Sequence, residues 1–513
     1  MTTLFRNLRP FEYATGALLF ALLAVSLPIG AQEQQPLPAA PSAVLAAQNE
    51  SLTQVPGSGL RFIAAGTQSG PGGTAIDRAN DASLPLSLDD AISIGLQRNI
   101  RLKYDRANER AVRGDNLGVL DALIPNLSLD AESSAQEINL AAMGFKPSLL
   151  SGFTRNGLIP AGYAFSNIVK VNTTQASIHA NQVLFNLPDY ELYRGTTNET
   201  KVVRLTTLTD RGDLILTIGT AYLRVLADQA NLTNAEAQLQ SAKTLFDQVT
   251  AKHNAGVGTN LDALRGQVEF QQREQNAFAA QSTAAKDKIR LARILGLPVG
   301  QKLELTDTAP FTQLADIDLE AAKITAYEHR KDLLSLEQQI ALTVREQKAV
   351  KYQRLPTLAF NGYYGVIGVT TGSYHGDFSA VGSLKFPIFR EAGQRGEQEV
   401  VDSELVALHQ RETDLRVAID SQIRSSMLDV NAANELVKVA QSNVELAQQE
   451  LADERDRFTS GVDDNLAVVD AETAVAGAQS QLVQSLYQYN VAKLQLARNT
   501  GVVESRYRAY LGK

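Results

Sequence analysis

Few side chains of this 513-residue chain have the types and spacing that chemistry requires. Cysteine is absent, which excludes disulfides, thiolate metal sites, thiol nucleophiles and a lipidated cysteine as an anchor. The five histidines are scattered, without the HxxxH or HExxH spacing of a zinc site: His179, His253, His329, His375 and His409. The chain also lacks a GxSxG motif and a phosphate-binding loop. We therefore expect no enzymatic activity, no cofactor and no metal site.

The remaining chemistry lies in the charged side chains. The net charge of −8 argues against nucleic acid as a partner, because phosphate binding requires clustered Lys and Arg. Carboxylates recur beside two glycines, where long helical patterns are interrupted: Asp262, Asp463, Asp464 and Asp470. What these groups can do depends on the elements that position them.

The N-terminus has the pattern of an export signal. Arg6 and Arg9 precede a short apolar run, Ala14–Leu27, and Ala31 offers a small residue for cleavage. The run is shorter than the roughly 20 residues of a transmembrane helix, although an uncleaved anchor remains an alternative. We predict a signal peptide over 1–31. Residues 32–84 are rich in Gln, Pro, Ala, Ser and Gly, and we expect a flexible segment there.

The strongest pattern is an internal repeat. The segment HNAGVGTNLDALRGQ aligns without gaps with FTSGVDDNLAVVDAE, and LARILG aligns with LARNTG at the same offset of 205 positions. Gly256 thereby matches Gly461, and Asn260 matches Asn465. The sequence predicts a first repeat over 85–298, a linker over 299–315, a second repeat over 316–502 and a tail over 503–513.

Helical periodicity flanks both glycines. Long helices are expected at about 188–253 and 391–458, each roughly 100 Å long at 1.5 Å per residue. Each turns at Gly256 or Gly461, where glycine permits the positive φ of a helix end. Helices at about 259–296 and 463–500 return, with Thr259 and Asp464 as candidate N-caps.

The returning helices repeat residues at steps of three and four. In the first copy this seam is Leu261, Leu264, Val268, Gln271, Gln275, Phe278, Ser282, Ala285, Ile289 and Ala292, and it contains many small or polar members. Such a seam suits helices packed side by side in a cylinder, whereas an ordinary antiparallel bundle is the alternative.

Each repeat also contains two strand-like segments, at about 125–135 and 174–187, and at about 356–367 and 379–389. Leu127, Leu129 and Ala131 alternate with polar residues, as a strand with one apolar and one wet face requires. Pro125 and Pro356 stand where a helix gives way to a strand. About ten residues suffice for a tilted strand to cross a bilayer, although a soluble hairpin on the helices is the alternative.

Four strands cannot close a barrel, and an open edge in lipid leaves backbone groups without partners. We therefore expect several copies to share one barrel. Two copies give eight strands and a nearly filled interior, whereas three give twelve strands and room for a passage. Three copies suit a conduit better.

The order of elements, the signal peptide and the prolines that open the strands resemble the TolC family of outer-membrane efflux proteins. The resemblance covers about Leu86 to Val502, and the paired NLDAL/NLAVV segments and the LGLP sequence are its most specific parts. It implies a mainly α fold with membrane β: a homotrimer with a twelve-stranded β-barrel in the outer membrane on a twelve-helix periplasmic α-barrel. It also implies a passive exit duct that works with a periplasmic adaptor protein, an inner-membrane pump and outer-membrane lipid. A periplasmic structural coiled coil without a pore is the alternative.

The resemblance also places functional residues at the two glycine turns. It implies that the turns form the periplasmic tip and contact the adaptor through Gly256, Val257, Leu261, Gly461, Val462 and Leu466. Asp470 matches an acidic position that narrows the tunnel, and Ala467 replaces its usual acidic neighbour. Asp262 matches a carboxylate that holds the tip closed. We hypothesise that Asp262, Asp463, Asp464 and Asp470 form a cation-binding constriction, whereas ordinary helix-start residues are the alternative.

Overall fold

The computed structural model describes residues 82–140, 142, 144, 168–298, 300–307, 311–369, 372–460, 462 and 465–512. The expected signal peptide and nearly all of the expected flexible segment lie outside these residues. Within the described part of the chain, no helix combines the length and the apolar composition needed to cross a membrane.

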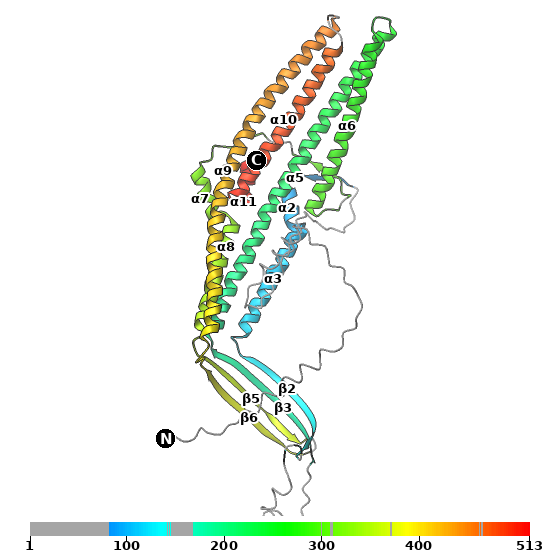
Figure 1. Cartoon of the computed structure of the whole chain (residues 1–513). Coiled ribbons are helices and arrows are strands. Elements are labelled where there is room, and N and C mark those ends of the chain that lie inside the picture. The colour runs from blue at the N-terminus through cyan, green and yellow to red at the C-terminus, as the bar shows by residue number, and fades with distance from the viewer. Residues whose placement is uncertain are drawn as a thin grey trace, which may run out of the picture. The chain divides into compact units, whose positions relative to one another are not determined.

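The two repeats contain the same elements in the same order (Figure 1). The first comprises β1 (Leu84–Leu86), α2 (Leu88–Arg98), α3 (Ile100–Asp121), β2 (Asn126–Asn139), β3 (Ile168–Phe185), α5 (Leu187–Asn254) and α6 (Asn260–Leu295). The second comprises β4 (Leu303–Leu305), α7 (Leu319–His329), α8 (Lys331–Tyr352), β5 (Thr357–Val369), β6 (Tyr374–Lys385), α9 (Glu391–Thr459) and α10 (Asn465–Asn499). The segment expected only as a tail folds into α11 (Val503–Leu511).

Four strands form one antiparallel sheet in the order β2-β3-β5-β6. Across it, Leu129 pairs with Ile178, Ile178 with Tyr364, and Tyr364 with Phe378, so one apolar row crosses one face. The adjacent row consists of Asp130, Ser177, Gly365 and Asp377 on the other face. The sheet therefore has an apolar face and a polar face, as the alternation in the sequence predicts.

The last strand differs from its expected position. It begins at Tyr374, before the expected start at about 379, and it ends at Lys385 rather than at 389. Pro387 follows shortly after this end and has no N–H to donate to a ladder, which explains the earlier end.

The two long helices run the whole length of the helical part, while shorter helices succeed one another beside them. Near the strands the neighbours follow the order α3, α5, α8, α9; towards the hairpin tips they follow the order α6, α5, α10, α9. The sheet lies at one end of the long helices and the two hairpin turns lie at the other (Figure 1). The region where α3 and α8 give way to α6 and α10 beside the long helices is called the change-over. The largest core cluster lies there and includes Ile215, Tyr222, Leu291 and Leu494.

The change-over is built twice, once in each repeat. Helix α6 ends at Gly296 (φ 71°) and α10 is closed by Gly501 (φ 76°), which are equivalent glycines in the left-handed region. A Cβ on Gly296 would lie 3.1 Å from the Arg98 carbonyl oxygen, and one on Gly501 would lie 2.8 Å from the Arg330 nitrogen. Each glycine thus lets a returning helix end against the break between two short helices.

Most of the expected seam of the first returning helix does not face a helix of the same chain. Leu261, Leu264, Val268, Phe278 and Ile289 are exposed. Other buried positions of α6 include Gly266, Arg273, Ala277, Ala284, Asp287 and Leu291. The seam is therefore a free surface of the single chain except at its last member, Ala292, which is buried in the largest core cluster.

Candidate functional site

The first hairpin turn is formed by a short segment between α5 and α6. Gly256 has φ 77° with open space around it, and the amides of Val257 and Gly258 both donate to the Lys252 carbonyl at 3.0 Å. These bonds satisfy a carbonyl group at the end of the helix. The Val257 side chain is 79% exposed.

Asp262 begins the returning helix, where its groups are engaged locally. Its amide donates to the Thr259 hydroxyl at 3.1 Å, which confirms Thr259 as the N-cap, and that hydroxyl donates to its carboxylate at 2.6 Å. The half-buried carboxylate thus stabilises the helix start.

The second hairpin turn is described only in part. Gly461, Asp463 and Asp464 lie outside the described residues. The Val462 amide donates to the Arg457 carbonyl at 3.0 Å, and its side chain is 72% exposed. Leu466 is also exposed at the start of α10, as Leu261 is at the start of α6. The described tip candidates other than Gly256 thus present apolar side chains at the end of the molecule.

Asn465 joins the two hairpins. Its side chain is fully buried, and its amide donates to the Asp262 carbonyl at 3.0 Å. Its repeat equivalent, Asn260, is exposed. Asn465 was recognised in the sequence only as part of the repeat, and the repeat gives no signal that one copy is buried.

A polar layer lies below the tip and ties three of the helices together. Glu472 of α10 accepts from Arg455 of α9 at 2.7 Å and from the Ser241 hydroxyl of α5 at 2.9 Å. Glu472 is buried, so its charge requires these partners.

Arg273 of α6 completes the polar layer. It is buried, and it donates to Glu269 at 2.5 Å and to the Thr473 hydroxyl of α10 at 2.9 Å. Its position one heptad after Gly266, on the inner face of α6, is the sequence signal that could have revealed it.

Asp470 is exposed on α10 and does not join the polar layer. Within the described residues, no three His, Asp or Glu side chains lie close enough to hold a metal ion. Asp463 and Asp464 lie outside the described residues, so the structure describes only Asp262 and Asp470 of the four acidic candidates.

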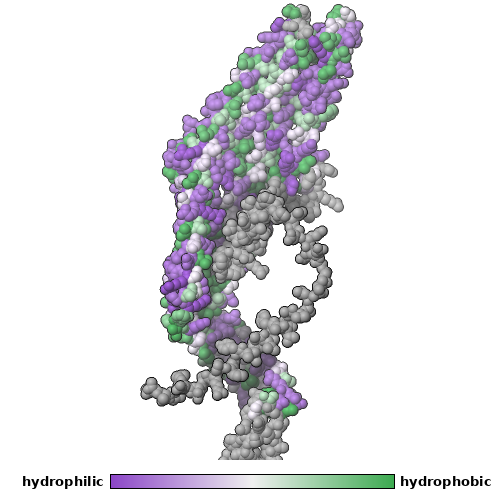
Figure 2. Space-filling view, viewed as in Figure 1, coloured by the Kyte–Doolittle hydropathy of each residue, from purple (hydrophilic) through white to green (hydrophobic). Residues whose placement is uncertain are grey.

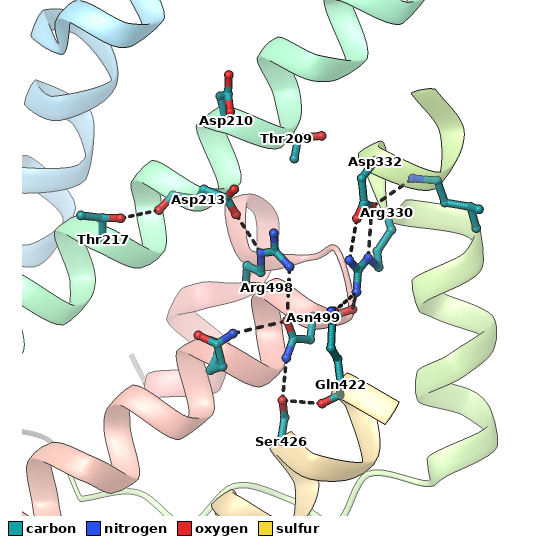
Figure 3. A network of polar contacts seen from close by, with 12 residues as sticks. Thr209, Asp210, Asp213, Thr217, Arg330, Asp332, Gln422, Ser426, Arg498 and Asn499 are labelled. Carbon is teal, nitrogen blue, oxygen red and sulfur yellow. Dashed lines mark hydrogen bonds and ion pairs between the residues drawn. The ribbon is translucent and has the colours of Figure 1, made fainter. Parts of the chain in front are cut away.

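A second polar network holds the change-over in the second repeat (Figure 3). The buried Arg330 guanidinium donates to Asp332 at 2.5 Å, to Gln422 at 2.6 Å and to the Asn499 carbonyl at 3.5 Å. Arg498 donates to Asp213 of α5 at 2.8 Å. The end of α10 is thereby fixed to α5, α8 and α9 together.

The first repeat holds its own change-over with fewer bonds. Asn99, the N-cap of α3, donates its side-chain amide to the Ile294 carbonyl at 3.2 Å. Ile294 and Asn499 stand at the same offset of 205 positions as the hairpin glycines. Equivalent carbonyls thus receive an amide donor in one repeat and a guanidinium in the other.

Comparison with known proteins identifies the relatives of this chain. A model of the family described as "Outer membrane efflux protein" matches residues 91–297 and 325–502. Outer membrane protein TolC of Escherichia coli (strain K12) is 22% identical over 405 residues, which cover 74% of this chain and 79% of that protein. Alkaline protease secretion protein AprF of Pseudomonas aeruginosa is 23% identical over 350 residues, covering 64% and 70%. Among solved structures, the Campylobacter jejuni CmeC outer membrane channel matches with a TM-score of 0.68 at 13% identity, covering 84% of this chain and 91% of that one.

Proposed function

Because this chain belongs to the outer membrane efflux protein family, we propose that three copies assemble into the exit duct of a tripartite efflux or type I secretion system. The duct conducts substrates passively from a periplasmic adaptor protein and an inner-membrane pump to the outside. As a member of the family, the chain is a non-enzymatic efflux channel of the outer membrane with a periplasmic tunnel. The sequence-based predictions of family, location and transport are confirmed.

The proposed trimer is supported by the outer strands and outer helices of the chain, which have a neighbour on one side only among the described elements. Strands β2 and β6 are the outer strands of the sheet, and each pairs on one side only among the described strands. Towards the tips, α6 and α9 are the outer helices. An open edge of a sheet in lipid requires a further strand, which a second copy supplies.

The outer helix α9 carries an apolar stripe on its free side. Val406, Val417, Leu428 and Val439 are exposed and follow one another at a constant spacing of eleven positions. This spacing is close to three helical turns, so the four side chains lie in line. Hydrophobic side chains on the face drawn in Figure 2 are spread along the helices among hydrophilic ones.

Residues of the α9 stripe and of the exposed α6 seam lie at equal separations from the two hairpin turns. Val439 stands as far before Gly461 in the sequence as Phe278 stands after Gly256. Leu428 and Ile289 form a second such pair, at equal separations from the same two glycines. At 1.5 Å per residue the two pairs stand roughly 33 and 50 Å from the tip. We infer that α9 of one copy packs against α6 of the next, which closes a ring head to tail.

The tips supply the proposed contact with the adaptor. Val257, Leu261, Val462 and Leu466 are exposed apolar side chains, and together with Gly256 and Gly461 they form the proposed docking residues. Exposed apolar groups at the end of a helical hairpin suit a partner that offers a matching apolar groove. The threefold set of Asp262, Asp463, Asp464 and Asp470 is proposed as a cation-binding constriction beside them.

Paired cysteines test the assembly, since the chain has none of its own. With Val439→Cys and Phe278→Cys together, oxidation in membranes should give covalent dimers and trimers on denaturing gels. The matched control, Leu428→Cys with Phe278→Cys, displaces one partner by about 16 Å along the helix and should stay monomeric. Equal cross-linking of both pairs, or none of the first, contradicts the proposed interface. Recovery of the protein in soluble form without detergent would instead favour a coiled coil without a pore.

A further inference from the structure

Four neighbouring helices near the strands each contribute one carboxylate to a row. The row consists of Asp115 of α3, Glu199 of α5, Glu346 of α8 and Glu404 of α9. The helices lie side by side in that order. Electrostatic repulsion links each neighbouring pair: Asp115 with Glu199, Glu199 with Glu346, and Glu346 with Glu404. The row thus crosses the whole width of the helical wall beneath the sheet.

Glu199 is the most buried member of the row. Glu199 is only 3% exposed, and its Oε2 atom is buried without a hydrogen-bond partner in the described structure. The amide of Asn116, which follows Asp115 on α3, donates instead to the Thr196 carbonyl and the Thr200 hydroxyl. A buried carboxylate without a partner is costly when charged and much less so when protonated.

The nearby cations and amides are engaged elsewhere. Arg345, beside Glu346 on α8, forms an ion pair of 2.9 Å with Glu191 of α5. The Gln347 amide donates to Asp402 of α9 at 2.5 Å. No described ion pair joins a member of the row to Lys or Arg. The charged group that acts on Glu199 is Asp115, and those that act on Glu346 are Glu404 and Glu199.

Burial and the charges of neighbouring carboxylates place Glu199 and Glu346 near their titration points at neutral pH. Burial, followed by the charge of Asp115, raises the pKa of Glu199 to about 7. Burial, followed by the charges of Glu404 and Glu199, raises the pKa of Glu346 to about 7. Burial also raises the pKa of Glu404. A raised pKa in the folded state gives a stabilisation that is complete below the ordinary value of 4.5 and is lost as the pH rises through about 7.

We propose that the carboxylate row is a proton-operated clasp: the protons carried by Glu199 and by Glu346 keep α5, α8 and α9 packed beneath the sheet, and their loss loosens this part of the wall. The clasp lies far from the hairpin tips and does not depend on the adaptor, the pump or the trimer proposed above. It makes the packing of the wall next to the membrane sensitive to pH.

Spin labels across the wall test the clasp in the full-length protein in detergent. Lys201→Cys on α5 and Ser403→Cys on α9 are exposed positions on either side of α8. Between pH 6 and pH 8.5 the distance distribution between the labels should lengthen and broaden, with a midpoint near pH 7. Glu199→Gln with Glu346→Gln should keep the low-pH distribution throughout. The matched control, Glu445→Gln with Glu450→Gln, changes two exposed carboxylates of α9 and should behave as the parent does.

A single substitution keeps the clasp testable if the double variant does not fold. Glu199→Gln removes a charge that raises the pKa of Glu346, so Glu346 should lose its proton at a lower pH and the midpoint should fall. A parent distribution that does not change with pH overturns the proposal. An unchanged midpoint in Glu199→Gln overturns it as well.

Discussion

Asn465 and Asn260 occupy equivalent positions of the two repeats but have different surroundings. Asn465 is fully buried and donates to the Asp262 carbonyl, whereas Asn260 is exposed at the first position of α6. The repeat in the sequence aligns them correctly. Which one is buried depends on contacts between helices that are far apart in the sequence, and local patterns do not contain this information.

Asn465→Ala should loosen the contact between the two hairpins. It removes a buried hydrogen bond and leaves the Asp262 carbonyl without this donor, at a cost of about 1–3 kcal/mol. Hydrogen exchange at the first turns of α6 and α10 should rise clearly relative to the parent. Asn260→Ala is the matched control and should leave exchange nearly unchanged. Equal effects of both variants contradict the bridging role.

Lys493 is a second residue whose role depends on burial. It is fully buried on α10, donates to the Thr312 carbonyl at 3.1 Å and lies 4.5 Å from the centre of the Tyr489 ring. Burial lowers its pKa from 10.5 to about 8. Between these values the unfolded chain binds more protons than the folded chain, so Lys493 makes stability rise with pH there.

Lys493→Met should remove that rise. The melting temperature of the parent relative to the variant should increase from pH 8 to pH 10, by an amount equivalent to at most about 3 kcal/mol. Lys438→Met, on the exposed side of α9, serves as the control and should keep the parent's pH dependence. A parent-to-variant difference that is flat over this range contradicts a depressed pKa.

At the scale of elements, the sequence predicted the long helices, the hairpin turns and the four strands. It did not predict the breaks at Asn99 and Arg330, since neither is marked by a glycine or proline. These breaks form where the α6 and α10 ends meet α2/α3 and α7/α8, so tertiary contacts determine them. The sequence predicted the α6 seam, but its pattern does not contain the information that most of the seam is exposed in the single chain.

Gly501 should tolerate substitution less well than Gly256. Both have positive φ, which costs a residue with a side chain about 1–2 kcal/mol. A Cβ at Gly501 would also meet the Arg330 backbone at 2.8 Å, whereas Gly256 has open space. Gly501→Ala should therefore lower the melting temperature more than Gly256→Ala does. An equal loss of melting temperature in both variants would show that the backbone around Gly501 accommodates a Cβ without added strain.

At the scale of the whole molecule, the open edges mean that one chain provides only a part of a wall. The outer strands and the exposed stripes of α6 and α9 lack partners in the described chain. The period-two pattern predicted one apolar and one polar face of the sheet. The proposed tip constriction stays a prediction, because the described acidic candidates are distributed over separate hairpins and Asp463 and Asp464 lie outside the described residues.

Asp470→Ala should raise the single-channel conductance of the assembled protein in planar bilayers and weaken block by divalent cations. The reason is that an exposed carboxylate repeated in each copy would attract cations at the proposed constriction. Asp414→Ala, which removes an exposed charge of α9 far from the tip, should leave both quantities close to those of the parent. Unchanged conductance in Asp470→Ala would remove this residue from the constriction.

The buried asparagine of one hairpin has a consequence for stoichiometry. The change-over has the same backbone plan in both repeats, with a glycine of positive φ closing the returning helix, although its side-chain bonds differ. The tips are not comparable, because the α9/α10 hairpin inserts the buried Asn465 against the α5/α6 hairpin, whereas its repeat equivalent Asn260 is exposed. A partner that distinguishes the two hairpins is therefore expected to bind once per chain. A partner that contacts only the exposed Val257 or Val462 is expected to bind twice per chain.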